Sequence, residues 1–214
     1  MRIPDERGRL AVLVHEVRSP VAALRAIGEA ARGSRLDAAA MAELVRLALS
    51  ACDAIGRIVS DAPVTAVERE RVDLGRLLAD TAAAATLRGA PVRVVAPSEL
   101  PDAVLDPVRV RQALENLVAN ALAQTPDGGE VVLEAGIEGA DALLSVTDSG
   151  PGIPEDEQMR VFEPGVRLGS GYAGSGLGLS VVKEIAEAHG GRVRVRSAPG
   201  EGATFTLVLP FERI

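Results

Sequence analysis

The sequence predicts an α+β fold, in which a helical hairpin precedes a second domain that mixes helices and strands. Apolar residues between Leu10 and Val59 recur at alternating steps of three and four, the spacing of helices that pack along a seam. After residue 67, short helical stripes alternate with strand-like runs and glycine-rich turns. We therefore predict two domains, residues 1–66 and 67–214.

The composition excludes several classes of function. Of the 214 residues, 47% are apolar but only 2% are aromatic, and the net charge is −7, so nucleic-acid binding is not expected. The single cysteine, Cys52, excludes a disulfide framework and fits a reducing compartment. Because no run of 18 apolar residues occurs and the N-terminus is charged, we expect no membrane contact from this chain, and a cytoplasmic location.

The N-terminal hairpin is predicted to dimerise. Gly33 is placed to end the first helix, and Asp37 is placed to cap the second. Pro63 is placed to end the second helix. Each helix carries a wide apolar stripe, and one hairpin cannot cover both stripes. Two copies can do so as a four-helix bundle, so we expect a homodimer.

His15 is one of only two histidines in the chain. Glu16 is its neighbour, and Ser19 lies one helical turn later on the same face. Because the seam positions are Leu13 and Val17, His15 is expected to be accessible to solvent. A lone histidine on such a helix is usually structural or solvated, so a chemical role for His15 depends on what the C-terminal half can deliver to it.

A helix predicted from about residue 107 to 122 carries Asn116 and Asn120, four residues apart on one face. Asparagine is a poor residue for a helix interior, so two on one face need a reason. The two side chains could simply face solvent or hydrogen-bond to a neighbouring turn. Alternatively, an amide oxygen binds Mg²⁺, an ion that prefers oxygen ligands.

Two glycine-rich motifs lie among the predicted strands. Asp148 follows a strand at 143–147 and could accept a hydrogen bond from an adenine amino group, or it could simply open a tight turn. Glycines at 174, 176 and 178 precede a helix, where free N–H groups can bind phosphate. The run 165–175 is predicted to be a lid, and His189 a helix-terminal residue. Further strands are predicted at 71–74, 92–95, 104–105, 131–135, 192–197 and 203–209.

Six segments together resemble the catalytic core of two-component sensor histidine kinases. In chain order they are VHEVRSP, ENLVANALAQT, DSGPGI, VFEPGVR, GSGLGL and GEGATF. They are similar to the phospho-acceptor box, the asparagine box, the first glycine box, the phenylalanine box, and the second and third glycine boxes. The resemblance covers about residues 9 to 210. It implies a dimerisation and histidine-phosphotransfer hairpin joined to an α/β sandwich that binds ATP, of the gyrase, Hsp90, histidine kinase and MutL type.

The resemblance also implies roles for the matching residues. His15 would accept the phosphoryl group, Glu16 would polarise its imidazole, and Ser19 would position water for dephosphorylation of the partner. Asn120 would hold Mg²⁺, with Asn116 beside it in the phosphate region. The ATP pocket would be formed by Asn116, Asn120, Asp148, Gly150, Gly152, Arg167, Gly174, Ser175, Gly176, Leu177, Gly178 and Thr204. The expected cofactors are ATP and Mg²⁺, and the expected partner is a response-regulator receiver domain.

The sequence departs from the family pattern at two positions. Ala123 stands where a lysine is common, so a phosphate contact is missing or comes from Arg167. Gly165 stands where the phenylalanine box usually repeats an aromatic, so we expect looser lid packing. Two other functions remain open: a degenerate kinase that acts as a phosphorelay scaffold or as a response-regulator phosphatase, and a serine kinase of the anti-sigma type.

Overall fold

The protein is described from a computed structural model, in which the chain divides into two compact units, Met1–Ala62 and Pro63–Ile214. The sequence suggested a boundary after residue 66. The structure describes residues 6–33, 37–60, 67–87, 92–97, 100–166, 176 and 178–210.

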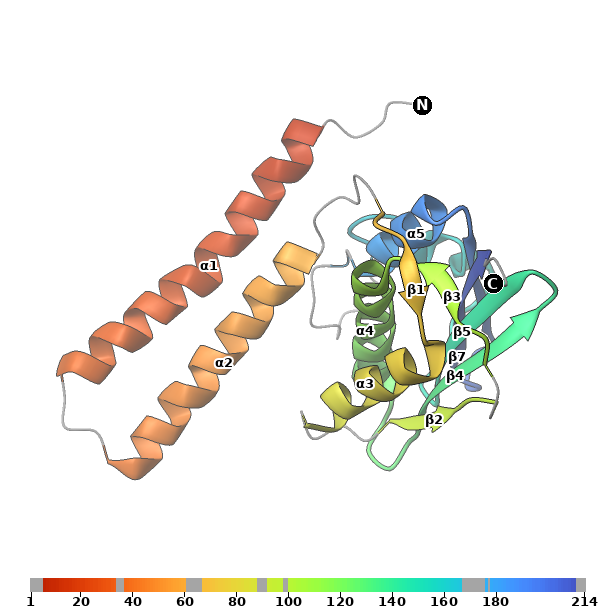
Figure 1. Ribbon diagram of the computed structural model, residues 1–214. Coiled ribbons are helices and arrows are strands. Elements are labelled where there is room, and N and C mark those ends of the chain that lie inside the picture. The colour runs from red at the N-terminus through yellow and green to blue at the C-terminus, as the bar shows by residue number, and fades with distance from the viewer. Residues whose placement is uncertain are drawn as a thin grey trace. The chain divides into compact units, whose positions relative to one another are not determined.

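The first unit is a hairpin of two long helices, α1 (Glu6–Gly33) and α2 (Ala38–Ser60) (Figure 1). The predicted ends are confirmed where the structure describes them. Helix α1 stops at Gly33, and the carboxylate of Asp37 accepts a hydrogen bond from the Ala40 amide at 2.7 Å, which caps α2. Helix α1 continues on both sides of Pro20, which is buried. Within the described ranges, no helix combines the length and apolar character needed to cross a membrane.

The second unit is built on a five-stranded sheet in the order β2-β4-β5-β7-β6. Strand β2 runs parallel to β4, and the other neighbours are antiparallel. A separate two-stranded sheet pairs β1 with β3. The strands are β1 (Glu70–Val72), β2 (Arg93–Val95), β3 (Ala103–Leu105), β4 (Val131–Glu138), β5 (Asp141–Asp148), β6 (Arg192–Ser197) and β7 (Ala203–Pro210).

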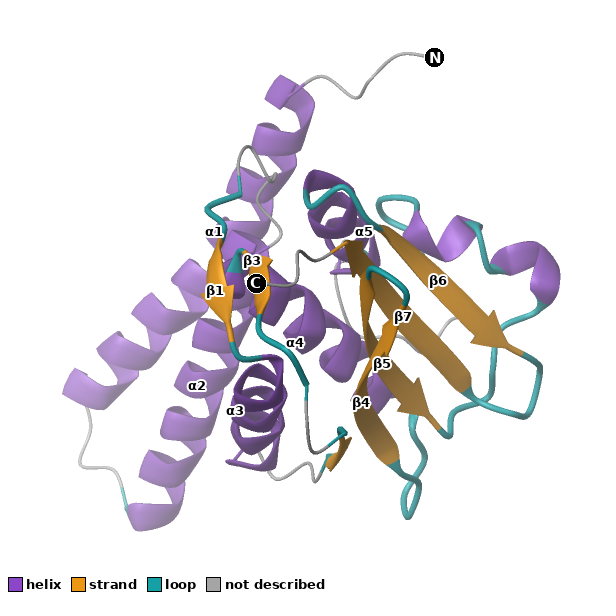
Figure 2. Cartoon of the chain, turned by 45° about the vertical axis from the view of Figure 1, so that its right-hand side comes forward, coloured by secondary structure: helices purple, strands orange, loops and turns teal. Residues whose placement is uncertain are grey.

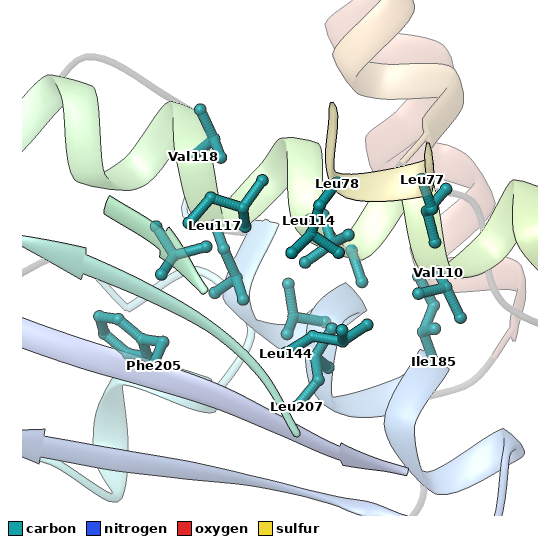
Figure 3. Close-up of a cluster of buried hydrophobic side chains, with 14 of the residues drawn as sticks. Leu77, Leu78, Val110, Leu114, Leu117, Val118, Leu144, Ile185, Phe205 and Leu207 are labelled. Carbon is teal, nitrogen blue, oxygen red and sulfur yellow. The ribbon is translucent and has the colours of Figure 1, made fainter. Parts of the chain in front are cut away.

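Three helices cover one face of this sheet: α3 (Leu74–Leu87), α4 (Pro107–Gln124) and α5 (Gly178–Ala188) (Figure 2). Their apolar stripes and the inward-facing residues of β4, β5 and β7 form one core (Figure 3). Leucine and valine supply most of it, and Phe205 is its largest fully buried side chain. Two short 3₁₀ turns, Glu155–Glu157 and Arg160–Phe162, follow β5. The predicted α+β class is confirmed.

Three predicted strands differ from the structure by two residues or more at one end. The strand expected at 71–74 is Glu70–Val72, because the Asp73 carboxylate accepts the Arg76 amide at 2.9 Å and starts α3 at Leu74. Strands β4 and β5 are also longer than predicted, with eight residues each. They form a continuous hairpin that turns near Gly139, whose φ is +64°.

Candidate functional site

Asp148 is the last residue of β5 and the most deeply buried carboxylate in the described part of the chain, with 5% of its surface exposed. Its Oδ1 accepts the Gly150 amide at 2.8 Å and the Ala203 amide at 3.2 Å. Burial raises the pKa of Asp148, although these two hydrogen bonds oppose the shift. Among the described residues, the hydrogen bonds to this carboxylate all reach Oδ1, so Oδ2 is left to bind a donor from outside.

Two glycines let the loops around Asp148 approach one another closely. Gly152 has φ +74°, and a Cβ there would lie 1.9 Å from the Ala198 carbonyl oxygen. Gly202 has φ +72°, and its Cβ would lie 2.0 Å from the Asp148 carbonyl oxygen. Both positions therefore require glycine. As a result, the turn after β5 packs directly against the turn before β7.

Thr204, which the resemblance places near the base, projects from the opposite side of its strand to the Asp148 side chain. In the β5–β7 ladder, Asp148 pairs with Ala203, and Thr147 pairs with Thr204. Because successive side chains of a strand point to opposite faces, Thr204 points away from the Asp148 side chain. Its hydroxyl lies 3.0 Å from that of Thr147. Ala203 is the neighbour of Asp148 instead, and the alternation of β7 could have identified it.

Helix α4 brings Asn116 to the start of α5. Both Asn116 and Asn120 are half-buried, four residues apart on one face. The Asn116 amide nitrogen donates to the carbonyl of Gly178, the first residue of α5, at 3.4 Å. The N-terminal end of α5, where the helix dipole is positive, therefore lies next to the Asn116 side chain, and Asn120 is one turn further along α4.

The two ends of the predicted lid are joined by their backbones. The Gly165 amide donates to the Gly176 carbonyl at 3.0 Å, and both residues have positive φ, +79° and +74°. Just before this point, Phe162 is buried and meets Phe205 edge-on, with ring centroids 6.0 Å apart. Gly165 therefore supplies a backbone conformation rather than the aromatic contact common in the family.

Several predicted residues cannot be placed. His15 and Glu16 lie on α1, but their side chains are outside the described part of the structure. The solvent accessibility expected for His15 therefore stays a prediction. Ser19 is described and exposed. Four predicted pocket residues also lie outside the described ranges: Arg167, Gly174, Ser175 and Leu177.

Comparisons with known proteins agree with this arrangement. Residues 105–213 match the family model "Histidine kinase-, DNA gyrase B-, and HSP90-like ATPase". The adaptive-response sensory kinase SasA of Parasynechococcus marenigrum is 34% identical over 98% of this chain and 58% of its own length. The alginate biosynthesis sensor protein KinB of Pseudomonas aeruginosa is 46% identical over 52% of this chain and 19% of its own length.

A solved structure of full-length ShkA in complex with AMPPNP superposes with a TM-score of 0.74 at 30% identity, over 97% of this chain and 46% of ShkA. The chain thus spans between a fifth and three fifths of the length of these relatives. Its match covers the hairpin as well as the sheet domain. The chain belongs to the histidine kinase-, DNA gyrase B- and HSP90-like ATPase family, as the catalytic core of a two-component sensor histidine kinase.

Proposed function

We propose that this chain is a protein histidine kinase, which transfers the γ-phosphoryl group of ATP to His15 and then to an aspartate of a response regulator. One observation carries the proposal. The buried Asp148 carboxylate, at the end of the central strand of a domain that belongs to this ATPase family, has one oxygen held by two backbone amides and the other without a hydrogen bond from the described residues.

The Asp148 carboxylate is the proposed receptor for the adenine base. Its Oδ2 accepts a hydrogen bond from the adenine amino group, beside the backbone of Gly150, Gly152 and Ala203. A Cβ at Gly150 would lie 2.8 Å from Asp148 Oδ1 and 2.9 Å from the Gln124 carbonyl oxygen, so glycine at this position lets the backbone lie close to the carboxylate. A guanine base presents a carbonyl at the same position and would not pair with the carboxylate.

The asparagines and the start of α5 are the proposed site for the phosphates. Among the described residues, no group of three His, Cys, Asp or Glu side chains could hold a metal ion. Mg²⁺ in nucleotide sites takes few protein ligands and several phosphate oxygens, so the amide oxygen of Asn120, with Asn116 nearby, fits that ion. When bound, Mg²⁺ neutralises phosphate charge. The remaining phosphate contacts are assigned to Arg167, Gly174, Ser175, Gly176, Leu177 and Gly178.

His15 is the proposed nucleophile. One ring nitrogen attacks the γ-phosphorus, a nitrogen–phosphorus bond forms, and the bond to the β–γ bridging oxygen breaks, releasing ADP. Glu16 accepts a hydrogen bond from the other ring nitrogen and offsets the positive charge that develops on the imidazole. Ser19 is exposed on the same helix and is the proposed position for a water that dephosphorylates the partner.

The hairpin is the proposed homodimer interface. In the single chain, Val21, Met41, Val45 and Leu47 leave 40% to 51% of their surfaces exposed. A second copy would cover these side chains in a four-helix bundle. The response-regulator receiver domain is the proposed partner for phosphotransfer, and the cytoplasm the proposed location, since ATP is available there.

Labelled ATP tests the proposal. We incubate the 214-residue chain with γ-labelled ATP and Mg²⁺ and examine the stability of the protein-bound label. A histidine kinase gives label that is lost in acid, survives base, and is absent in His15→Gln. Acid-stable label would instead indicate a serine kinase, and no label would indicate a degenerate kinase.

A further inference from the structure

The N-terminal end of α4 and the C-terminal end of α5 meet around one buried imidazole. His189 follows the last residue of α5 and is 1% exposed. Its Nε2 lies 3.1 Å from the Asp106 amide nitrogen, and its Nδ1 lies 2.8 Å from the Ile185 carbonyl oxygen. Because an amide N–H can only donate, Nε2 must be the acceptor and Nδ1 must carry the hydrogen. The ring is therefore neutral and in a single tautomer.

The segment that arrives from the hairpin binds to both helix ends at this point. The Glu68 amide donates to Asp106 Oδ2 at 2.9 Å, and the Arg69 guanidinium donates to the His189 carbonyl oxygen at 2.9 Å. That carbonyl lies at the end of α5, where helical carbonyls lack partners and a positive charge is favourable. We call Glu68, Arg69, Asp106 and His189 the clasp.

Helices α4 and α5 run antiparallel, and α4 makes a polar contact near each end of α5. Asn116 bonds the Gly178 carbonyl at one end, and Asp106 bonds the His189 ring at the other. These contacts are separated by about 15 Å of helix. Figure 3 shows Ile185 of α5 beside Val110 of α4, between apolar surfaces. Because apolar contacts have no direction, the polar contacts at the ends fix the position of α5 along its own axis.

We propose that His189 is a positioning residue for phosphoryl transfer, and that the clasp makes the position of the α5 phosphate end depend on attachment of the linker. This inference rests on the kinase function proposed above. The adenine pocket lies near Gln124, at the opposite end of α4 from Asp106. Loss of the clasp should therefore slow transfer from bound ATP while leaving the affinity for the nucleotide almost unchanged.

Protonation of the ring would open the clasp. A second ring N–H would then face the Asp106 amide N–H, and neither could accept. Burial lowers the pKa of His189 and Arg69 lowers it further, while the Ile185 carbonyl and the Asp106 carboxylate oppose the shift. The stabilising contribution of the neutral ring is therefore present above the unfolded value of about 6.5. It is lost as the pH falls from that value through the lower folded pKa.

Two substitutions at position 189 separate positioning from simple packing. In His189→Gln, the amide oxygen reaches the place of Nε2 and can still accept the Asp106 N–H. In His189→Asn, the shorter amide can still donate to the Ile185 carbonyl but cannot reach Asp106. Arg69→Gln removes the cation from an exposed position, where folding is not at risk. Arg194→Gln is the matched control, because Arg194 pairs with Glu138 on the sheet, away from the clasp.

The rate constant kcat and the KM for ATP of phosphohistidine formation are measured on the full 214-residue chain. His189→Asn should lower kcat by about 10- to 100-fold with KM within about threefold, since small misplacements of reacting groups cost that much. His189→Gln should stay within about threefold of the wild type, Arg69→Gln should lower kcat by about threefold or more, and Arg194→Gln should match the wild type. The ratio of wild-type to His189→Gln kcat should fall as the pH drops below about 6.5.

A second measurement needs no ATP. The Asp106 amide resonance of the wild type should shift, and its hydrogen-exchange protection should fall, as the ring protonates, whereas His189→Gln should show neither change. Equal kcat values for His189→Asn and His189→Gln, or a change in KM alone, would overturn the proposal. A wild type that forms no phosphohistidine removes the kinase function and the positioning role with it. The Asp106 titration would then still report whether the clasp exists.

Discussion

Replacing Asp148 by asparagine should weaken ATP binding and stabilise the fold at the same time. The asparagine oxygen will keep the Oδ1 position, because the Gly150 and Ala203 amides both donate there. The new NH₂ group will then take the place of Oδ2 and face the adenine amino group, donor against donor. A hydrogen bond to a charged group contributes about 1.5–3 kcal/mol, and the unpaired donors add to the loss. About 3 kcal/mol corresponds to a roughly 100-fold increase in Kd.

The effect of Asp148→Asn on stability has the opposite sign. Burial raises the folded pKa of Asp148, so the ionised carboxylate destabilises the folded state at neutral pH. The neutral amide should therefore have a higher free energy of unfolding at pH 7. As the pH falls through the folded pKa, the wild type takes up a proton and the difference shrinks. It should vanish below the unfolded value of about 3.9.

Calorimetric titration with a non-hydrolysable ATP analogue gives the Kd, and urea unfolding between pH 3 and 8 gives the stability. Asp141→Asn is the matched control. It lies at the other end of β5, pairs with Arg192, and should leave the Kd unchanged. An unchanged nucleotide affinity in Asp148→Asn would refute the binding role of this carboxylate. A lower free energy of unfolding at pH 7 would refute the claim that the carboxylate destabilises the folded protein.

Three further outcomes are expected. Gly152→Ala should lower the free energy of unfolding by about 3 kcal/mol or more, because the residue has a positive φ and its Cβ would clash with Ala198. The control Gly136→Ala should lower it by less than about 1 kcal/mol, because no atom lies within 4 Å of that Cβ. Equal losses of the two variants in urea unfolding would contradict the packing argument. Asp106→Asn should keep the α4 cap but make stability depend less on acid pH. Burial raises the pKa of Asp106, but the backbone N–H donors outweigh it and lower the pKa overall, so the wild-type carboxylate stabilises the fold above about pH 3.9 and this stabilisation is lost below it. Unfolding free energies of the two proteins that change in parallel as the pH falls would disprove this. Val45→Glu should convert the dimer to a monomer in light scattering, and a dimer that persists would place the interface elsewhere.

The sequence predicted the elements that carry strong periodic patterns. The alternation of Arg192–Ser197 and the wide stripe of α4 both gave the correct element in the correct place. Asp73 was missed as a helix cap because the apolar pattern ran across it, and a cap depends on a single side-chain contact. Thr204 was assigned to the pocket by motif position alone, whereas strand alternation turns it to the other face.

The environment of His189 lay beyond sequence reasoning for a different reason. A histidine beside two glycines at a helix end is most simply a solvated terminal residue. Its hydrogen bonds are made with Asp106, 83 positions earlier in the chain, and with Arg69, 120 positions earlier. Such contacts between distant segments leave no periodic signal. They appear only when the strands and helices are assembled around them.

The amide-to-carbonyl bond between Gly165 and Gly176 has a consequence for how relatives of this chain can diverge. Both partners are main-chain atoms, so the bond does not depend on any side chain between the two glycines. Inserted or exchanged residues in that interval would start and finish at the same two points, and α5 would keep its starting position. Swapping the interval between kinases should therefore alter the proposed phosphate contacts while the bond that joins Gly165 to Gly176 stays in place.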